Sequence, residues 1–185
     1  MTSDLIYLVQ NVTSNNSSII IRNLTIADIN QTYCNWLNEP DVNKYLESRF
    51  INWNLPSLRK YFHEKNKTEL MLAIVDSEHN LHIGNIKISS IEKIHKRAEL
   101  GIIIGDRNYW GKGIATAAIK MVTDYCFTIL ELHKVTAGAY AENISSIKAF
   151  QKNGFTIEGE RKDHCLTPSG WTSVILMGKI NKNIS

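Results

Sequence analysis

The sequence has few cysteines, and they do not suggest a disulfide framework. Cys34, Cys126 and Cys165 are odd in number and widely spaced in the 185-residue chain. Small secreted domains that depend on disulfides usually carry an even number of cysteines. We therefore expect buried or free thiols, as in proteins of a reducing compartment.

Long apolar runs and strong net charge are also missing. No apolar run approaches the ~20 residues that a membrane span needs, and the start MTSDLIYLVQ lacks the basic and apolar regions of a signal peptide. The net charge of +3 is mild, whereas nucleic-acid binding usually needs a strongly basic face. We expect a cytoplasmic protein with neither a membrane nor a nucleic acid as partner.

Metal-binding patterns are absent from the sequence as well. The six histidines form neither an HExxH motif nor a cluster with cysteines. We expect structural or surface histidines and no metal site. The histidines are His63, His79, His82, His95, His133 and His164.

What the sequence does contain is an ordinary globular balance of 43% hydrophobic and 21% charged residues. The length suits one domain with a sizeable core, and no internal repeat or long linker divides it. We expect a single domain over residues 1–185. Residues 1–17 would form an N-terminal extension with an extra strand and a polar loop, the latter over Val12–Ser18.

Hydrophobic periodicity predicts a mixture of helices and strands. The first half should contain a strand over Ser18–Asn23, a helix over Ala27–Leu37 capped by Thr25, a helical turn over Pro40–Leu46, a helix over Pro56–Lys67, and strands over Leu70–Asp76, His82–Ile91 and Arg97–Gly105. The second half should contain a helix over Gly111–Leu130, a strand over Lys134–Tyr140, a helix over Glu142–Gly154 and a hairpin of Phe155–Lys162 with Trp171–Lys179. This order predicts an α+β fold with a mixed, mostly antiparallel sheet of about seven strands. The crossover Gly105–Tyr140 should make one strand pair parallel or splayed.

The stretch RNYWGKGIATAAIK (Arg107–Lys120) places a glycine-rich turn before a helix. A P-loop needs Ser or Thr after the lysine, but Gly113 follows Lys112. A dinucleotide fingerprint needs a third Gly or Ala where Thr116 stands. A third interpretation fits better, because the first N–H groups of a helix have no partner within it and bind anions. A pyrophosphate would suit this turn.

At this turn the sequence resembles the GCN5-related N-acetyltransferases (GNAT), whose acetyl-CoA signature is Gln/Arg-x-x-Gly-x-Gly/Ala. The matching stretch is Asn108–Gly113, with Asn at the first position and Arg107 beside it. The resemblance is strongest to the ribosomal-protein-alanine acetyltransferase-like (RimJ/RimL-type) branch, and it covers Ser18–Lys179. It rests on the blocks AELGIIIG, YWGKGIATAAI and LHKVTAGAYAENISSIKAFQKNGF and on the terminal hairpin. It implies one GNAT domain with helices on both faces of a twisted sheet and splayed central strands.

The resemblance also implies how acetyl-CoA would bind. The strand ending in Ile102, Ile103 and Ile104 should pair with pantetheine, and Asn143 should bond the cofactor. Ser146 matches a serine near the thiol. Phe150 stands where many members have a Tyr that acts as the general acid, so Phe150 should instead pack against the cofactor. The pyrophosphate should be held by the N–H groups of Gly111, Lys112, Gly113, Ile114 and Ala115, and Asn108 at the first signature position should also bind the cofactor.

Acetyl transfer needs a neutral amine and a stabilised thiolate. We hypothesise that Glu99 deprotonates the amine, directly or through water. It could instead face solvent or pair with Arg97 or Lys87. Ser146 is the candidate for the acid, although a serine in a first helical turn often bonds the backbone.

The acceptor should enter beside the segment Trp36–Phe50. Glu47 could hold an ammonium, and Arg49 could hold a carboxylate or phosphate. Alternatively, both residues belong to an exposed helix end. Tyr140 could orient the amine, or it could be part of the core. The acceptor would be a protein N-terminus, an amino-sugar nucleotide or a small amine. The alternative function is a non-catalytic acyl-CoA-binding or regulatory module. The apolar strand SVILMGK would also allow a homodimer.

Overall fold

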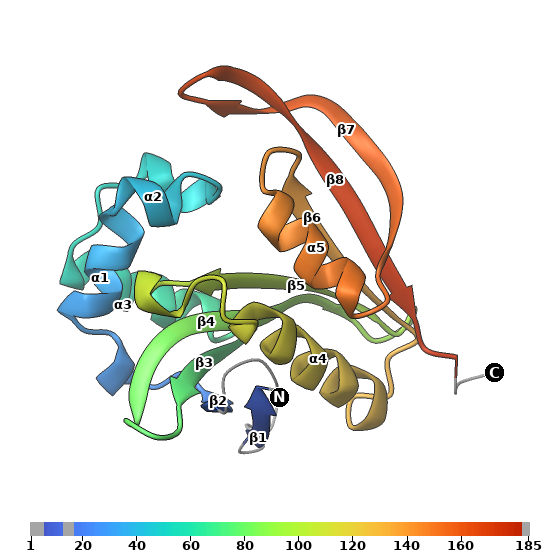
Figure 1. Ribbon diagram of the computed structural model, residues 1–185, viewed down its shortest axis with the longest axis horizontal. Coiled ribbons are helices and arrows are strands. Elements are labelled where there is room, and N and C mark those ends of the chain that lie inside the picture. Colours follow the sequence, from blue (N-terminus) through green and yellow to red (C-terminus); the bar gives the residue numbers. More distant parts are fainter. Residues whose placement is uncertain (1–5, 13–16, 183–185) are drawn as a thin grey trace.

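The computed structural model describes residues 6–12 and 17–182 (Figure 1). Residues 13–16 of the predicted polar loop lie outside this range. The strands are β1 Tyr7–Val12, β2 Ser17–Asn23, β3 Leu70–Asp76, β4 Leu81–Glu92, β5 Arg97–Ile104, β6 Lys134–Tyr140, β7 Thr156–Thr167 and β8 Gly170–Ile180. The α-helices are α1 Gln31–Asn38, α2 Pro40–Asn43, α3 Leu55–Lys65, α4 Ile114–Thr128 and α5 Ile144–Lys152, and the 3-10 helices are η1 Ile26–Asp28, η2 Glu47–Phe50 and η3 Arg107–Tyr109.

The described strands form one eight-stranded sheet in the order β1-β2-β3-β4-β5-β6-β8-β7. Every neighbouring pair is antiparallel except β5 and β6, which are parallel. The predicted mixed, mostly antiparallel α+β fold is confirmed. The strand beyond the expected seven is β1, which lies in the N-terminal extension.

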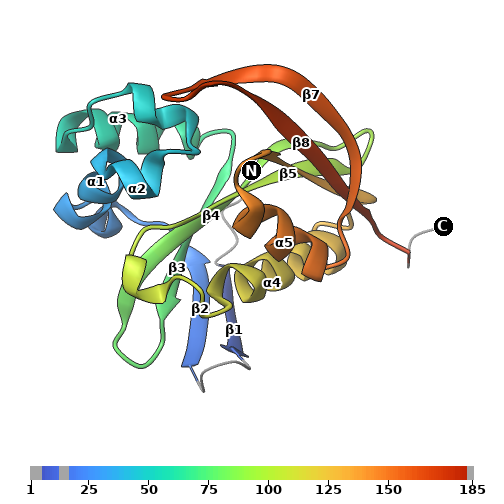
Figure 2. The same ribbon diagram turned by 45° about the horizontal axis from the view of Figure 1, so that its top comes forward.

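Alternation along β3 shows how the sheet is covered on both faces. Leu72 and Ile74 join the large core cluster that includes α4 and α5 residues. Met71, Ala73 and Val75 point the other way and pack in a second cluster with α1 and α3. Figure 2 shows the two helical layers on either side of the strands. The prediction of helices on both faces is confirmed.

The centre of the sheet splits where β5 and β6 end. The two strands pair only from Arg97 with Lys134 to Leu100 with Ala137. Beyond this point β5 continues to Ile104 and β6 to Tyr140, but the two strands no longer pair with each other. The backbone edge of β5 facing this gap is therefore available to another partner, as the predicted splayed pair requires.

Several predicted helix starts are wrong, because side-chain caps and, at α4, the left-handed conformation of Gly113 set them elsewhere. Thr25 and Asp28 form a capping box that closes the short η1, so no helix runs from Ala27. The α1 helix begins only after Asn30, whose side chain accepts a hydrogen bond from the Tyr33 N–H at 3.1 Å. The predicted helix over Gly111–Leu130 begins at Ile114, and the one predicted from Glu142 begins at Ile144.

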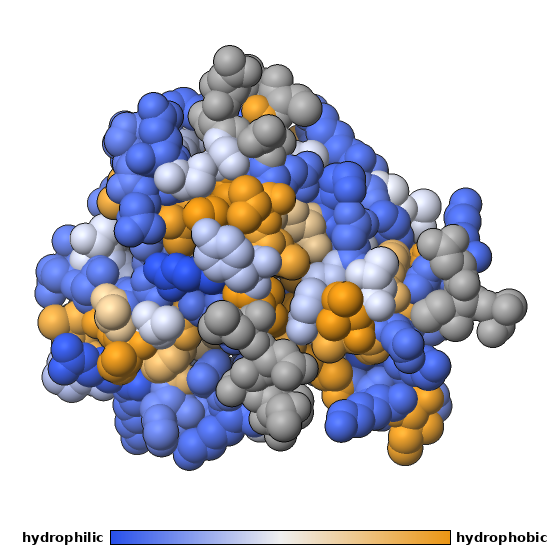
Figure 3. All heavy atoms as spheres, turned by 90° about the horizontal axis from the view of Figure 1, so that it is seen from below, coloured by the Kyte–Doolittle hydropathy of each residue, from blue (hydrophilic) through white to orange (hydrophobic). Residues whose placement is uncertain are grey.

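The β7–β8 hairpin leaves the body of the sheet and arches over towards η2 (Figures 1 and 2). At its tip the Leu166 carbonyl accepts a hydrogen bond from Arg49 of η2. The opposite edge strand, β1, exposes Tyr7 and Val9. The face seen from below carries apolar side chains near its centre, bordered by hydrophilic ones (Figure 3). Among the described residues, no helix is long and apolar enough to cross a membrane.

Candidate active site

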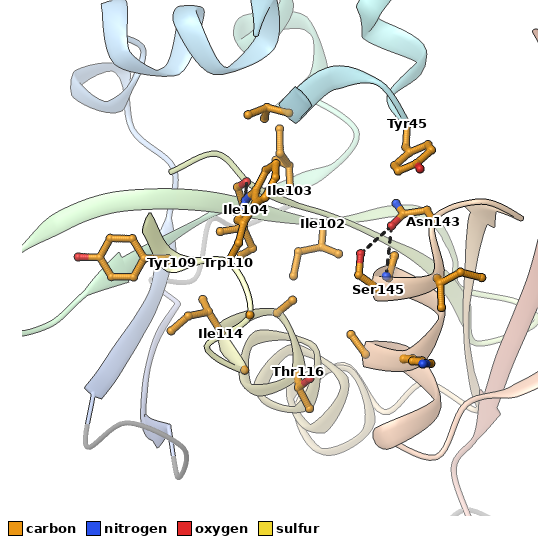
Figure 4. A pocket seen from close by; sticks show the side chains of 18 of the residues that line it. Tyr45, Ile102, Ile103, Ile104, Tyr109, Trp110, Ile114, Thr116, Asn143 and Ser145 are labelled. Carbon is orange, nitrogen blue, oxygen red and sulfur yellow. Dashed lines mark hydrogen bonds between the residues drawn. The ribbon is translucent and has the colours of Figure 1, made fainter. Parts of the chain in front are cut away.

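A cleft of about 580 Å³ opens where β5 and β6 separate. The end of β5 supplies one wall through Ile102, Ile103 and Ile104, and the first turns of α4 and α5 supply two others (Figure 4). Tyr45, which follows α2, closes the remaining side and donates a hydrogen bond to the Glu142 carbonyl at 3.3 Å. The cleft therefore joins four separate segments of the chain at the split in the sheet.

The glycine turn shapes the cleft at the start of α4. Gly111 and Gly113 have φ values of 72° and 78°, which only glycine adopts readily. The first bond of the helix joins the Ala117 N–H to the Gly113 carbonyl at 3.0 Å. The N–H groups before Ala117 thus lie at the positive end of the helix dipole, where an anion binds favourably. Gly111, Gly113, Ile114 and Ala115 all line the cleft, and their role in holding a pyrophosphate stays a prediction.

The buried carboxylate of Asp76 holds the glycine turn in place. The Tyr109 hydroxyl donates to Asp76 at 2.6 Å, and His79 contacts the same oxygen at 2.8 Å. Burial raises the pKa of Asp76, but the bonds from Tyr109 and His79 outweigh it and hold the pKa below its usual range. Burial and the bond to Asp76 raise the pKa of Tyr109 to about 12. Tyr109, which the sequence did not single out, therefore anchors the turn as a neutral phenol.

Two further contacts hold the same turn against its neighbours. The Trp110 indole N–H donates to the Ile104 carbonyl at 2.8 Å. Arg107 pairs with Asp41 at 2.8 Å and with Glu39 at 3.5 Å. These contacts connect the turn to β5 and α2. They give Arg107 a structural role beside the signature.

The start of α5 forms the facing wall. The Asn143 Oδ1 accepts from the Ser146 N–H at 3.2 Å and from the Ser145 hydroxyl at 3.0 Å (Figure 4). Asn143 and Ser146 both line the cleft, together with Lys148, Lys152 and, from the α2 side, Lys44. The cleft therefore combines polar groups with three cations that suit an anionic ligand, and sequence reasoning had missed the lysines.

Three predicted cofactor residues do not line the cleft. Asn108 lies in η3, where its N–H donates to Asp106. The Lys112 ammonium lies 5.4 Å from the centre of the Tyr109 ring. Phe150 is 1% exposed and packs edge-on against Phe155 in the core. The predicted contact of Phe150 with the cofactor does not match this position, because its ring fills the space behind α5.

The predicted base, Glu99, is exposed on β5. It alternates with the core residues Ala98 and Leu100, so it faces the side of the sheet that carries α1–α3. Lys87 pairs with Glu69 at 3.0 Å, which does not support the alternative that Lys87 neutralises Glu99. The catalytic role of Glu99 stays a prediction.

The predicted acceptor residues lie together but bind one another. The Tyr140 hydroxyl donates to the Glu47 carboxylate, and Arg49 Nη1 donates to the Tyr140 oxygen at 2.9 Å. Burial and the bond to Glu47 raise the pKa of Tyr140. None of the three is among the residues that line the described cavities. Their role as substrate ligands stays a prediction, and their contacts join η2 to β6 and the hairpin.

A second cavity of about 140 Å³ lies on the other side of β5, beneath α1, α3 and η2. It shares Leu46, Ile102 and Ile103 with the cleft. The two spaces therefore meet at the strand that the resemblance assigns to pantetheine. Sequence reasoning missed this cavity, because its walls come from six elements that are spread along the chain.

Comparison with known proteins agrees with this geometry. Residues 18–156 match the model of the acetyltransferase (GNAT) domain. The chain is 29% identical over 151 residues to an uncharacterised N-acetyltransferase, p20, of Bacillus licheniformis, covering 79% of this chain and 83% of that protein. It is 37% identical over 101 residues to the spermidine N(1)-acetyltransferase of Escherichia coli K12, which spans about half of each protein (55% and 52%).

Among solved structures, the chain is similar to the spermidine N-acetyltransferase of Vibrio cholerae in complex with CoA and spermine. The TM-score is 0.79 at 25% identity, covering 88% of this chain and 95% of that one. The matched domain includes the split strands, the glycine turn and the start of α5. The chain therefore belongs to the GNAT family of acetyltransferases, for which acetyl-CoA is the co-substrate.

Proposed function

We propose that the protein transfers the acetyl group of acetyl-CoA to a primary amine by direct attack within a ternary complex. The observation that carries the proposal is the meeting of two spaces at Ile102 and Ile103. The anion-binding cleft would hold acetyl-CoA on one side of β5, and the smaller cavity would admit the amine from the other. Similarity to spermidine acetyltransferases supports a small amine as acceptor.

In this reaction the amine nitrogen bonds to the acetyl carbon while the carbon–sulfur bond breaks. One proton leaves the amine, and the thiolate takes one up. Glu99 is the proposed base, directly or through water, because its carboxylate faces the acceptor side of β5. Ser146 is the proposed donor to the thiolate, because it lines the cleft in the first turn of α5.

The test measures acetyl-CoA binding and then thiol release with amines of each predicted class, namely a peptide N-terminus, an amino-sugar nucleotide and a polyamine. The proposal expects release with at least one class. Binding without release from any class would favour the alternative, a non-catalytic acyl-CoA-binding module.

Glu99→Gln provides the test of the base. We expect a fall in kcat of about 10²–10⁴-fold and the loss of the ascending limb in the pH profile. Glu160→Gln, an exposed strand carboxylate on β7 that lines neither cavity, serves as the control and should keep the wild-type kcat. An E99Q enzyme with an unchanged kcat and pH profile would remove Glu99 from the mechanism.

The finer assignments are also part of this proposal. Placement in the RimJ/RimL-type branch and a cytoplasmic location remain our inference from the sequence. A homodimer through β8 is testable by light scattering, where a mass near 42 kDa, twice the 21.0 kDa of one chain, would support it.

A further inference from the structure

The second cavity has a composition that selects its ligand. Tyr33, Trp53 and Tyr61 supply aromatic walls, and most of the remaining walls are aliphatic. Trp53 and Tyr61 meet edge to face at 5.3 Å between ring centres. Its volume of about 140 Å³ is close to the ~150 Å³ cavity that holds a benzene ring in an engineered protein. The cavity therefore fits a phenyl or leucyl-sized group.

The charged residues that line this cavity disfavour the binding of a cationic ligand. No Asp or Glu is among its described lining residues, whereas Lys87 is. The carboxylate that pairs with Lys87, that of Glu69, is bound by both Lys87 and Lys65, each at 3.0 Å. Moving an ammonium into apolar surroundings is costly unless a carboxylate compensates it. The second and third ammonium groups of a polyamine would find no such partner here.

One buried polar group of a residue that lines the cavity has no partner among the residues that the structure describes. Asn85 is 6% exposed, and its side-chain amide nitrogen is buried without a hydrogen bond. Its amide oxygen is already held by His82 Nε2 at 2.9 Å, which fixes the orientation of the amide. A buried donor without an acceptor is costly. A ligand oxygen in the cavity would satisfy it.

The position of Asn85 places this donor close to the proposed reaction. Asn85 lies opposite Ile103 in the β4–β5 ladder, and Lys87 lies opposite Gly101. Gly101 has no side chain, and a Cβ built there would lie 3.2 Å from the Lys87 side chain. The cavity thus borders the segment of β5 that separates it from the cleft.

We propose that the second cavity is a specificity pocket for an uncharged alkyl or aryl group on the acceptor amine, with the Asn85 amide nitrogen donating to an oxygen next to the reacting nitrogen. The inference rests on the proposed function and narrows its acceptor. The ligand chemistry is that of an apolar α-amino amide, supplied by a free amino-acid amide or by the first residue of a peptide. A polyamine is excluded as the preferred acceptor.

The first experiment compares pentan-1-amine with 1,4-diaminobutane, which has the same number of heavy atoms but a second ammonium. We expect kcat/KM for pentan-1-amine to be at least tenfold higher. Equal rates, or faster acetylation of 1,4-diaminobutane or spermidine, would refute the pocket while leaving the acetyltransferase function intact.

The second experiment tests Asn85 with phenylalaninamide and 2-phenylethylamine, which lacks the carboxamide. In Asn85→Ala we expect the ratio of the two kcat/KM values to fall at least fivefold, with 2-phenylethylamine changed by less than threefold. The different basicities of the two amines cancel when the same ratio is compared between variants. Asn66→Ala, an exposed position outside both cavities, should keep the wild-type ratio. An unchanged ratio in N85A would overturn the role of Asn85.

Binding separates failure of the pocket from failure of the function. The same amines are titrated by calorimetry into the CoA-loaded enzyme, with a peptide beginning in Phe to distinguish peptides from free amides. Tighter binding of the apolar amines than of 1,4-diaminobutane supports the pocket even if no thiol is released. Absence of turnover with every amine would instead refute the proposed function. If the apolar amines bind no more tightly than 1,4-diaminobutane, the pocket is refuted.

Discussion

Replacement of Gly105 by Ala should destabilise the protein through one specific collision. Gly105 follows β5, where the chain passes under Trp36 of α1. A Cβ at this position would lie 2.0, 2.2 and 2.6 Å from three carbons of the indole. Non-bonded carbons prefer about 3.5–4.0 Å. The indole would therefore have to move by more than ~1 Å.

The surroundings of Trp36 give little room for that movement. The side chain is 8% exposed and lies edge-on to His82 at 5.0 Å and tilted to Tyr33 at 5.9 Å. Extra atoms in a well-packed core typically cost ~1–3 kcal/mol. For a chain of this size each kcal/mol lowers Tm by roughly 2–4 °C. We expect a fall of about 2–12 °C for Gly105→Ala.

Thermal and urea unfolding followed by circular dichroism would measure the loss, with Gly138→Ala as the matched control. A Cβ at Gly138 would meet Val174 at an ordinary 3.5 Å. The control should be neutral or more stable by up to about 1 kcal/mol, because alanine restricts the unfolded chain. A Tm of G105A within one degree of wild type, or equal losses in both variants, would refute the packing argument.

Three further changes test other parts of the structure. Burial raises the pKa of Asp28, but hydrogen bonds from Arg22 and Thr25 outweigh this effect and lower the pKa to about 2. The ionised carboxylate therefore adds about 1–2 kcal/mol to the free energy of unfolding above pH ~4, and this contribution is lost as the pH falls towards 2. Urea unfolding should thus show a penalty for Asp28→Asn at pH 7 that shrinks at pH 2–3, and a pH-independent difference would contradict this. Tyr109→Phe removes the bond to Asp76 and should weaken acetyl-CoA binding about threefold to tenfold, whereas an unchanged Kd in calorimetry would show that the turn needs no such anchor. Asn143→Ala removes the cap of α5, so it should lower the free energy of unfolding by ~1 kcal/mol and raise the KM for acetyl-CoA. Unchanged values of both would show that Asn143 neither stabilises α5 nor contributes to cofactor binding.

Local sequence patterns predicted most of the fold. Apolar runs bounded by turn-like residues predicted β3, β4 and β5, and the bounds of β6 were predicted correctly as Lys134–Tyr140. Helix starts were less predictable, because they depend on competing caps. Thr25 and Asn30 are both good N-caps. The Thr25 backbone N–H donates to the Asp28 carboxylate at 2.8 Å, and the turn that begins after Thr25 ends at Asp28.

The conformation of the glycine turn was predictable, and the second cavity was not. The glycine turn is contiguous in sequence, so its backbone conformation follows from the residue types of Gly111 and Gly113. The second cavity depends on Tyr33, Trp53 and Asn85, which come from three distant segments and meet only in the folded chain. The position of Phe150 in the family motif predicted a contact with the cofactor, but its ring points into the core and packs against Phe155.

The most direct test of this account is a calorimetric titration with acetyl-CoA, followed by thiol release in the same samples after addition of amines. The account predicts saturable binding with one site per chain, weakened in Tyr109→Phe, and thiol release with a primary amine. Absence of acetyl-CoA binding by the folded protein would contradict the assignment of the cleft and the function derived from it.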